Sequence, residues 1–474
     1  MSEERRLTTE EKALKINLTN DIYGSFAEIG AGQEVAANFF KAGGSSGTIA
    51  YTHSAYDMKV SDTMYGDTSR YVCEERLLQM LETEYSNMVN TLEEKQKTNR
   101  FFAFANTVES LNYHRTNQGQ GWIGLKLQLE VGKEPNEIVL HVKMHDYSHK
   151  RQQEALGILG VNLIYASFFQ RDSIESYLDA LTHRLPKDRI EIDMMRLNGP
   201  DFEHIDNRII ALNLVKNGLT DATMFDLTGA VLQPKTALYK KNVLLMRGRF
   251  RPMTKVHVNV IEEGTKLYLQ ENDVKEEDMC ILLELTLKDL TADGKISDKD
   301  FIDRAELLCS MGYTVMISNY LKHYKMIEYI SMITRGKKIG VLLGIETLHT
   351  IFDEKYYDNL NGGLLEAFGR GFGHNVKMYA YPSLRGNQIY DLDQFDVPKH
   401  LTGLLQFMLT NNKIAKYLDY DESLLHIKSD EVLKKIKKGE NWEGDVPESV
   451  MKAIKFYNLF GFHTKEKKNL VSSN

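Results

Sequence analysis

The sequence predicts a mixed α/β fold in which β-strands alternate with helices over most of the chain. Short runs rich in Val, Ile, Leu and Met recur, as expected of parallel strands that are covered on both faces. Longer segments with apolar residues at helical spacing separate most of these runs. Apolar residues make up 42% of the 474 residues, enough for a large core. Such alternation predicts βαβ units.

Strand-like runs become regular after residue 137. Eight are expected, at 138–144, 189–195, 224–227, 243–247, 280–286, 314–319, 340–345 and 377–382. Eight strands suit a (β/α)8-type barrel, which we favour slightly, and also a doubly wound open sheet. We therefore expect an N-terminal mixed α/β region (1–136), a mainly parallel β/α domain (137–390) and a C-terminal helical region (391–474).

Charge and cysteine content limit the function classes. The net charge of −7 argues against a general nucleic-acid binder. The three cysteines, Cys73, Cys280 and Cys309, form no CxxC pair, which excludes a disulfide framework and a cysteine-rich zinc site. No signal-peptide pattern is visible, and the longest apolar stretch, 157–169, is too short to span a bilayer. We expect a cytoplasmic protein without membrane or nucleic-acid partners.

The most specific motif is RGRFRPMTKVH at residues 247–257, between an expected strand and an expected helix. It resembles the G-x-F-x-P-x-T-x-G-H motif of adenylyl-transferring enzymes such as nicotinate-nucleotide and pantetheine-phosphate adenylyltransferases. The positions that match are Gly248, Phe250, Pro252, Thr254 and His257, whereas Val256 stands where the family has glycine. The resemblance implies that the glycine lets the backbone approach a nucleotide and that the Thr and His are catalytic, contacting phosphates where charge develops. If the chain catalyses nucleotidyl transfer, the resemblance also implies Mg²⁺ as cofactor. The alternative interpretation of the motif is a buried Phe/Pro turn with basic residues on the surface.

Further polar residues are expected to complete a phosphate site. The basic side chains in the motif are Arg247, Arg249, Arg251 and Lys255, which suit a phosphorylated ligand. Ile317-Ser318-Asn319 partly matches the second signature of the family, an I-S-S-T-x-x-R turn, but lacks its arginine. Polar residues also follow the expected strands at Asp193, Asp226, Glu284, Asn319 and Glu346, where α/β sites lie. Ordinary helix-capping polarity is the alternative.

A glycine-rich segment, FAEIGAGQE at residues 26–34, looks like the first loop of S-adenosylmethionine-dependent methyltransferases. Gly30 and Gly32 would allow close backbone approach at a helix N-terminus. Glu34 replaces the third glycine, and the second strand does not end in the acidic residue that would bind the ribose. A tight strand-to-helix turn is the other interpretation.

One pattern resembles a calcium loop. Residues 289–300, DLTADGKISDKD, have acids at the first and fifth positions of an EF-hand loop and glycine at the sixth. Asp300 replaces the usual bidentate glutamate. The alternative is a turn in which Ser297 caps the next helix.

Three histidines and Asp146 form a candidate group of metal ligands. His141, His145 and His149 would align on a helix. However, residues 138–144 are expected to form a strand, which leaves the third histidine in a loop. We therefore predict no metal site.

Across nearly its full length the chain resembles a bacterial family of unknown function. The stretches that carry this resemblance are 26–34, 152–166, 248–252, 317–320 and 352–357. Members are often called nicotinate-nucleotide adenylyltransferase and sometimes TonB-dependent receptor. The receptor name does not fit, because no signal peptide is expected. The resemblance implies a cytosolic bacterial protein.

A rival interpretation is a non-enzymatic, self-associating structural or scaffold protein. Each motif departs from its family at one position or more. The chain also contains 24 tyrosines, and tyrosine is favoured at protein–protein interfaces. The helix expected at 401–409 carries an apolar stripe, formed by Leu401, Leu404, Leu405, Met408 and Leu409. Such a stripe could dock a second subunit, so we expect a homo-oligomer.

Overall fold

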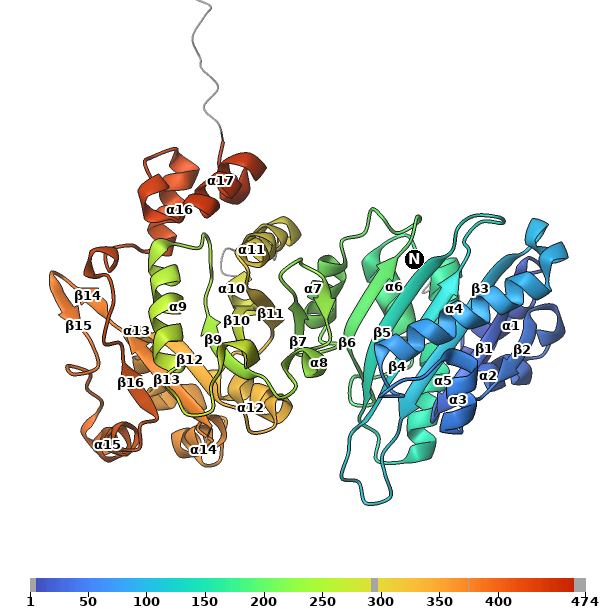
Figure 1. Ribbon diagram of the computed structural model, residues 1–474, viewed down its shortest axis with the longest axis horizontal. Coiled ribbons are helices and arrows are strands. Elements are labelled where there is room, and N and C mark those ends of the chain that lie inside the picture. The colour runs from blue at the N-terminus through green and yellow to red at the C-terminus, as the bar shows by residue number, and fades with distance from the viewer. Residues whose placement is uncertain (1–5, 291–296, 374, 464–474) are drawn as a thin grey trace, which may run out of the picture. The chain divides into compact units, whose positions relative to one another are not determined.

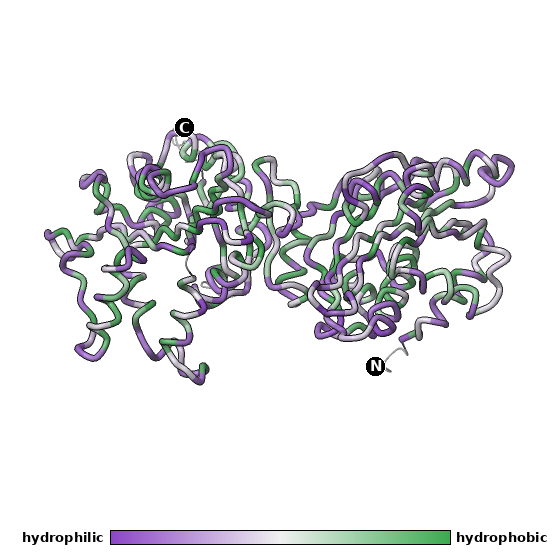
Figure 2. The backbone as a smooth tube through the Cα atoms, turned by 60° about the horizontal axis from the view of Figure 1, so that its bottom comes forward, coloured by the Kyte–Doolittle hydropathy of each residue, from purple (hydrophilic) through white to green (hydrophobic). Residues whose placement is uncertain are grey.

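The computed structural model describes residues 6–290, 297–373 and 375–463. The chain forms two compact units, Met1–Thr220 (unit 1) and Asp221–Asn474 (unit 2). Each unit is built on its own β-sheet with helices packed against it (Figure 1). The hydrophobic segments gather inside each unit, whereas the turns are mostly hydrophilic (Figure 2).

Unit 1 contains a six-stranded mixed sheet in the order β2-β1-β3-β4-β5-β6. β1 is parallel to both β2 and β3, and the remaining neighbours are antiparallel. Its strands are β1 (Ile22–Gly30), β2 (Ile49–His53), β3 (Arg100–Glu109), β4 (Gly119–Leu127), β5 (Asn136–Met144) and β6 (Ile190–Asn198). Its helices are α1 (Thr9–Asn17), α2 (Val35–Ala42), α3 (Met58–Tyr65), α4 (Glu74–Thr91), α5 (His149–Phe169), α6 (Ile174–Leu181) and α7 (Asn207–Lys216).

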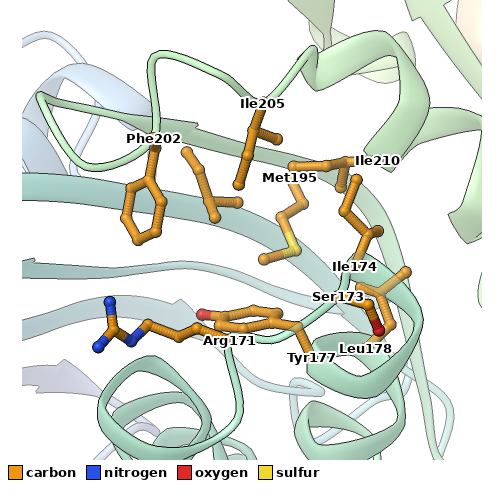
Figure 3. Close-up of a pocket in the computed structure, with 10 residues that line it drawn as sticks. Arg171, Ser173, Ile174, Tyr177, Leu178, Met195, Phe202, Ile205 and Ile210 are labelled. Atoms are coloured by element: carbon orange, nitrogen blue, oxygen red, sulfur yellow. The ribbon is translucent and has the colours of Figure 1, made fainter.

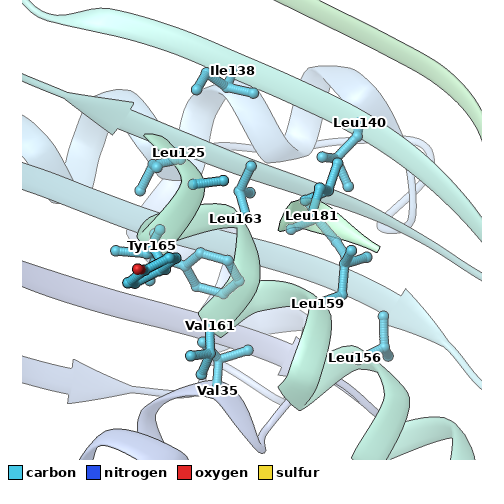
Figure 4. Packing of buried hydrophobic residues seen from close by; sticks show 14 of the residues in the cluster. Val35, Leu125, Ile138, Leu140, Leu156, Leu159, Val161, Leu163, Tyr165 and Leu181 are labelled. Atoms are coloured by element: carbon cyan, nitrogen blue, oxygen red, sulfur yellow. The ribbon is translucent and has the colours of Figure 1, made fainter. Parts of the chain in front are cut away.

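Helices cover both faces of this sheet. α5 is apolar around most of its circumference, as expected of a helix buried on all sides. Figure 4 shows its Leu159 and Leu163 among strand residues such as Leu140. On the other face, α4 packs against β3 and β4, where Leu81 fills the space above Gly124.

Unit 2 contains an eight-stranded sheet in the order β16-β13-β12-β9-β10-β11-β7-β8. Its strands are β7 (Ala222–Phe225), β8 (Val231–Leu232), β9 (Asn242–Arg247), β10 (Met279–Thr286), β11 (Thr314–Ser318), β12 (Ile339–Gly344), β13 (Val376–Tyr381) and β16 (Ile414–Lys416), with a separate hairpin of β14 (Ser383–Arg385) and β15 (Gln388–Tyr390). Its helices are α8 (Pro234–Leu238), α9 (Lys255–Tyr268), α10 (Leu287–Leu290), α11 (Asp298–Ser310), α12 (His323–Thr334), α13 (Ile345–Ile351), α14 (Gly363–Gly371), α15 (Thr402–Thr410), α16 (Ser429–Lys438) and α17 (Glu448–Tyr457).

This sheet is open and doubly wound. The strands from β9 to β13 and β16 run parallel, and β7 joins β11 antiparallel. Alternate residues of β12 face opposite layers. Val341 packs in the core with Ile330 of α12, whereas Leu342 lies under Gly264 of α9. β9 therefore lies at the centre, with helices on both sides of it.

The eight strands expected after residue 137 all form, but they do not form one parallel domain. β5 pairs antiparallel with β4 and β6 in unit 1, and β7 is antiparallel in unit 2. The described strands do not close into a barrel, since β16 and β8 are the edges of the unit 2 sheet. The boundary between the units along the chain falls between residues 220 and 221 rather than between 136 and 137, because β5 and β6 complete the first sheet.

The expected C-terminal region also differs. α15 and β16 belong to the core of unit 2, and the apolar stripe on α15 packs against its own unit. Leu405 is 8% exposed and Met408 is 2% exposed. The stripe is therefore not a free docking face, and a homo-oligomer stays a prediction without this support. Among the described residues, no helix has the length and apolar character needed to cross a membrane.

Gly160 tests the close packing of α5. A Cβ atom there would lie 2.3 Å from Cγ2 of Val35 and 3.0 Å from the ring of Phe104. We expect Gly160→Ala to destabilise unit 1 by roughly 1–3 kcal/mol, because a packed core accommodates an added methyl poorly. Urea unfolding followed by Trp122 fluorescence, in a Trp442→Phe background, measures this, since these are the two tryptophans of the chain.

Gly403→Ala is the matched control. A Cβ at this α15 position meets nothing within 4 Å. It should leave the Trp122 transition unchanged, and it should stabilise its own helix by up to about 1 kcal/mol. Equal effects of the two substitutions would contradict the packing described for α5.

Candidate functional site

The segment between β9 and α9 lies where the direction of the sheet connections reverses. From β9 the chain adds β10 and β11 on one side, and then β12, β13 and β16 on the other. In open α/β sheets, ligands bind outside the carboxyl ends of the strands at such a switch point. The segment of residues 248–254, called here the β9–α9 loop, leaves the central strand at that point and leads into the first turn of α9.

A buried ion pair anchors the start of this loop. Arg247 donates from Nε to Glu284 Oε2 at 2.7 Å and from Nη2 to Oε1 at 2.9 Å. Its Nη2 also donates to the carbonyl oxygen of Tyr320 at 2.8 Å, and the Ser318 hydroxyl donates to the same carboxylate. Glu284 and Ser318 are fully buried. These three expected ligand residues therefore bind each other, and they join the carboxyl ends of β9, β10 and β11.

Gly248 is required by internal packing. Its N–H donates to the carbonyl oxygen of Glu284 at 3.1 Å. A Cβ atom on Gly248 would lie 2.9 Å from Cζ of Phe250, whose ring is fully buried. Phe250 has a φ of 43°, and Pro252 is buried beside it. The expected Phe/Pro turn thus exists, and it fixes the path of the loop.

Thr254 and His257 cap the start of α9. The Thr254 N–H donates to Nδ1 of His257 at 3.1 Å, and the Thr254 hydroxyl lies 2.9 Å from the same nitrogen. Burial lowers the pKa of His257 to about 4. The imidazole is therefore neutral at neutral pH. Since Nδ1 accepts a hydrogen bond from a backbone N–H, the hydrogen is on Nε2, which can donate to a ligand.

Carboxylates already balance the arginines of the loop. Arg249 pairs with Asp430 of α16 at 3.1 Å, and Arg251 pairs with Asp300 at 2.7 Å. α16 also contacts the loop through Ser429, whose hydroxyl donates to the carbonyl oxygen of Pro252 at 3.0 Å, consistent with its place near the start of α9 in Figure 1. Three of the four basic residues of the expected cluster are therefore already paired, and the fourth, Lys255, is exposed and has no ion pair within the described part of the chain.

The calcium interpretation fails at the residues that can be compared. Asp300 pairs with Arg251 and Arg304, and Asp289 accepts a hydrogen bond from the Thr286 hydroxyl. Residues 291–296 lie outside the described part of the chain. Ser297 caps α11 by accepting from the N–H of Asp300 at 3.3 Å, as the alternative predicted.

The sequence did not single out Lys322 and His323, which begin α12 at the same edge of the sheet. Burial and the positive charge of Arg247 lower the pKa of His323 to about 3. Burial also lowers the pKa of Lys322, whose Nζ lies 4.1 Å above the ring centre of Tyr356. In the sequence they are marked only by their position shortly after β11, one of the strands that ends in polar residues. They add a neutral imidazole and a cation near the loop.

The other expected ligand residues lie in different places. Glu346 begins α13 at the same edge as the loop, but its carboxylate pairs with Arg385 at 2.9 Å. Asn319 is exposed, beyond the end of β11. Asp226 lies at the opposite edge because β7 runs antiparallel, and it accepts from the N–H of Thr228 at 2.8 Å. Asp193 belongs to unit 1.

In the methyltransferase-like loop, a side chain of the protein itself binds the N-terminus of α2. The carboxylate of Glu28 accepts hydrogen bonds from the N–H groups of Val35 at 2.9 Å and Ala36 at 3.1 Å, at the start of α2. Gly30 and Gly32 are needed for close packing on β3, since a Cβ on Gly32 would lie 2.1 Å from Asn106 Oδ1. The carboxyl group of Glu28 thus fills the position that an anionic cofactor group would take.

The three histidines considered for metal binding have separate partners. His141 Nδ1 lies 2.5 Å from Asp193, His145 lies 3.5 Å from Glu191, and His149 lies 2.8 Å from the Ser110 hydroxyl. Within the described residues, no group of three His, Cys, Asp or Glu side chains could hold a metal ion.

Figure 3 shows an apolar cavity in unit 1, into which Tyr177, Met195, Phe202 and Ile205 point. Its volume is about 30 Å³, which is about the volume that one water molecule occupies in the liquid. Pockets for small molecules are roughly ten times larger. We therefore interpret this cavity as imperfect packing.

No protein-family model matches the chain, and no curated protein does. Similar solved structures include the competence/damage inducible protein CihA from Agrobacterium tumefaciens, with 19% identity and a TM-score of 0.25 over 35% of this chain and 98% of that chain. A competence-damaged protein (CinA) superfamily protein from Enterobacter cloacae has 9% identity and a TM-score of 0.27 over 35% and 96%. TM-scores this low support no inference about fold or function.

Glu28 gives a pH-dependent prediction. Burial raises its pKa from 4.5 to about 7. The folded state therefore keeps a proton that the unfolded chain releases, so this contribution to stability is complete below pH 4.5 and is lost as the pH rises to about 7. Between about pH 5 and 8, the wild type should lose roughly 2–3 kcal/mol more unfolding free energy than Glu28→Gln.

Urea unfolding across this pH range measures the difference, and the same substitution at the exposed Glu75 is the control. Glu75→Gln should follow the wild-type pH dependence. Parallel pH curves for the wild type and Glu28→Gln would show that Glu28 is not the buried, proton-binding cap described here.

Proposed function

We propose that unit 2 binds a nucleotide or a related phosphorylated molecule at the β9–α9 loop. The observation that carries the proposal is the position of this loop, which leaves the central strand at the switch point of a doubly wound sheet. The G-x-F-x-P-x-T-x-x-H pattern of residues 248–257 lies in that loop and the first turn of α9. Neither feature depends on the arginines that are already paired.

The groups that would contact a phosphate are the first N–H groups of α9, Nε2–H of His257 and the ammonium group of Lys255. α9 is 14 residues long, so its N-terminus carries a favourable field for an anion. The neutral imidazole donates one hydrogen bond at a fixed position, because Thr254 holds its other nitrogen. Lys255 is exposed and adds a positive charge in the first turn.

We further propose adenylyl transfer to a mononucleotide as the reaction. A phosphate oxygen of the mononucleotide attacks the α-phosphorus of ATP, and the bond from that phosphorus to the oxygen bridging to the β-phosphate breaks. Pyrophosphate leaves with the electron pair, and Mg²⁺ carried by the nucleotide balances its charge. Such a step needs positioning and electrostatic stabilisation more than covalent help. His257 and Lys255 are suited to that role.

Isothermal titration calorimetry with ATP, nicotinate mononucleotide and pyrophosphate, each with Mg²⁺, tests the binding proposal. We expect binding of at least one of them, and Lys255→Gln should weaken it roughly threefold to tenfold through loss of one charged contact. Lys266→Gln is the matched control, since Lys266 is on the same helix and pairs with Glu263 at 2.7 Å. The absence of heat with all three ligands would refute the proposal.

Pyrophosphate release from ATP with nicotinate mononucleotide tests the transfer step. Turnover should fall at least about a hundredfold in His257→Ala, because a donor to the developing charge is lost. Binding of ATP without pyrophosphate release for this or other mononucleotides would restrict unit 2 to a binding role.

A further inference from the structure

Unit 1 contains an open pocket that is separate from the β9–α9 loop. It lies between α1, the C-terminal part of α5 and α6 with the turn that follows it, and its volume is about 460 Å³. This is within the range of pockets that hold small molecules. Four of the residues around it are basic or imidazole side chains: Arg6, Lys12, Lys15 and His183.

Lys12 is buried, and none of the described residues provides a carboxylate that bonds to it. The residue is 4% exposed, and its Nζ donates to Asn162 Oδ1 at 2.7 Å and to the carbonyl oxygen of Ala180 at 3.4 Å. Nδ1 of His183 lies 3.3 Å away. Among the described residues these hydrogen-bond partners are all neutral, and a buried ammonium with neutral partners only is costly. Burial accordingly lowers the pKa of Lys12 to about 8.

The position of the Lys12 ammonium group is fixed by its surroundings. Asn162 Nδ2 donates to the carbonyl oxygens of Leu181 at 2.9 Å and His183 at 2.8 Å, which directs its Oδ1 at Lys12. Lys12 Nζ also lies 5.3 Å from the ring centre of Tyr165. The side chain is therefore part of a built site and not a solvated surface lysine.

More positive charge surrounds this group than negative charge. Lys15 Nζ lies 3.4 Å from the Tyr165 hydroxyl and 4.6 Å from the ring centre of Phe169, at the exposed edge of the pocket. The acid that acts on Lys12, Asp179, is paired with Arg6 at 3.0 Å. Burial and the nearby cations lower the pKa of His183, so its imidazole does not add a second buried charge.

We propose that this pocket binds a small molecule through an oxyanion group, a phosphate or a carboxylate. Lys15 at the exposed edge donates to the oxyanion, and Lys12, whose ammonium hydrogens already point at Asn162, Ala180 and His183, acts as a fixed positive charge beside it. The oxyanion supplies the negative charge that Lys12 lacks inside the protein. This proposal is independent of the function proposed for unit 2.

Lys12 also permits a chemical test with an anionic aldehyde. A buried lysine with a lowered pKa is partly neutral near about pH 8 and acts as a nucleophile. Pyridoxal 5′-phosphate is a suitable probe: its aldehyde carbon forms a C=N bond with Lys12 Nζ, water leaves, and borohydride reduces the imine to a stable amine. Mass spectrometry of peptides from the full chain then gives the labelling rate at each lysine.

Pyridoxal is the matched probe, since it has the same aldehyde without the phosphate. We expect Lys12 to react at least about tenfold faster with the phosphorylated aldehyde, because the phosphate contacts cations in the pocket. Excess inorganic pyrophosphate should slow labelling of Lys12 but not of the exposed Lys41 on α2. Lys15→Gln should reduce the preference for the phosphorylated aldehyde, whereas Lys41→Gln should not.

Three results would overturn the proposal. One is labelling of Lys12 no faster than of Lys41, and another is equal reaction of Lys12 with both aldehydes. The third is unchanged labelling of Lys12 in excess pyrophosphate. Because Lys15 lies at the exposed edge of α1, Lys15→Gln should leave the fold intact, and its effect reports on the pocket alone.

Discussion

The buried pair of Arg247 and Glu284 is the interaction on which the carboxyl edge of unit 2 depends. It joins β9 to β10, and the Ser318 hydroxyl and the Tyr320 carbonyl attach β11 to the same group. Breaking such a pair by removing one partner costs about 3–5 kcal/mol, because a buried charge is left uncompensated. The start of the β9–α9 loop is therefore fixed before any ligand arrives. Arg247, Glu284 and Ser318 hold the loop in position, and in the proposed site the residues that follow them would contact the phosphate.

Internal acidic side chains occupy three places among the described residues where an external anion could bind. Glu28 fills the N-terminus of α2, Glu284 neutralises Arg247, and Asp300 pairs with Arg251. Two cations differ from this pattern. Lys255 is exposed at the start of α9, and Lys12 is buried among neutral groups. Each proposed site contains one of these two cations, for which the described residues supply no paired carboxylate.

The sequence predicted local structure well because apolar runs and helical spacing are local properties. The strands expected at 138–144 and 243–247 form as β5 and β9. Pairing partners are long-range, so the sequence could not place β5 in an antiparallel sheet or β7 antiparallel to β11. The antiparallel direction of β7 is enough to place Asp226 at the opposite edge of the sheet. The apolar stripe of α15 has the same pattern whether it faces a partner or its own core.

The sequence predicted that residues 248–254 lie between a strand and a helix, but not the partners of their side chains. The motif at residues 247–257 identified the loop, since glycine, proline and a helix cap leave a recognisable local pattern. The partners of its arginines are 37 to 181 residues away in sequence, so their neutralisation could not be predicted. Lys12 shows no motif at all. It is an ordinary lysine on an amphipathic helix until the fold buries it against Asn162.

Backbone hydrogen–deuterium exchange, with and without ATP and Mg²⁺, tests the central claim that the carboxyl edge at the β9–α9 loop is the nucleotide site. A ligand on the first turn of α9 takes up free N–H groups and slows their exchange. The account predicts protection of the amides in residues 248–258, with unit 1 unchanged apart from the pocket around Lys12. Bound nucleotide that left residues 248–258 exchanging at their original rates would contradict it.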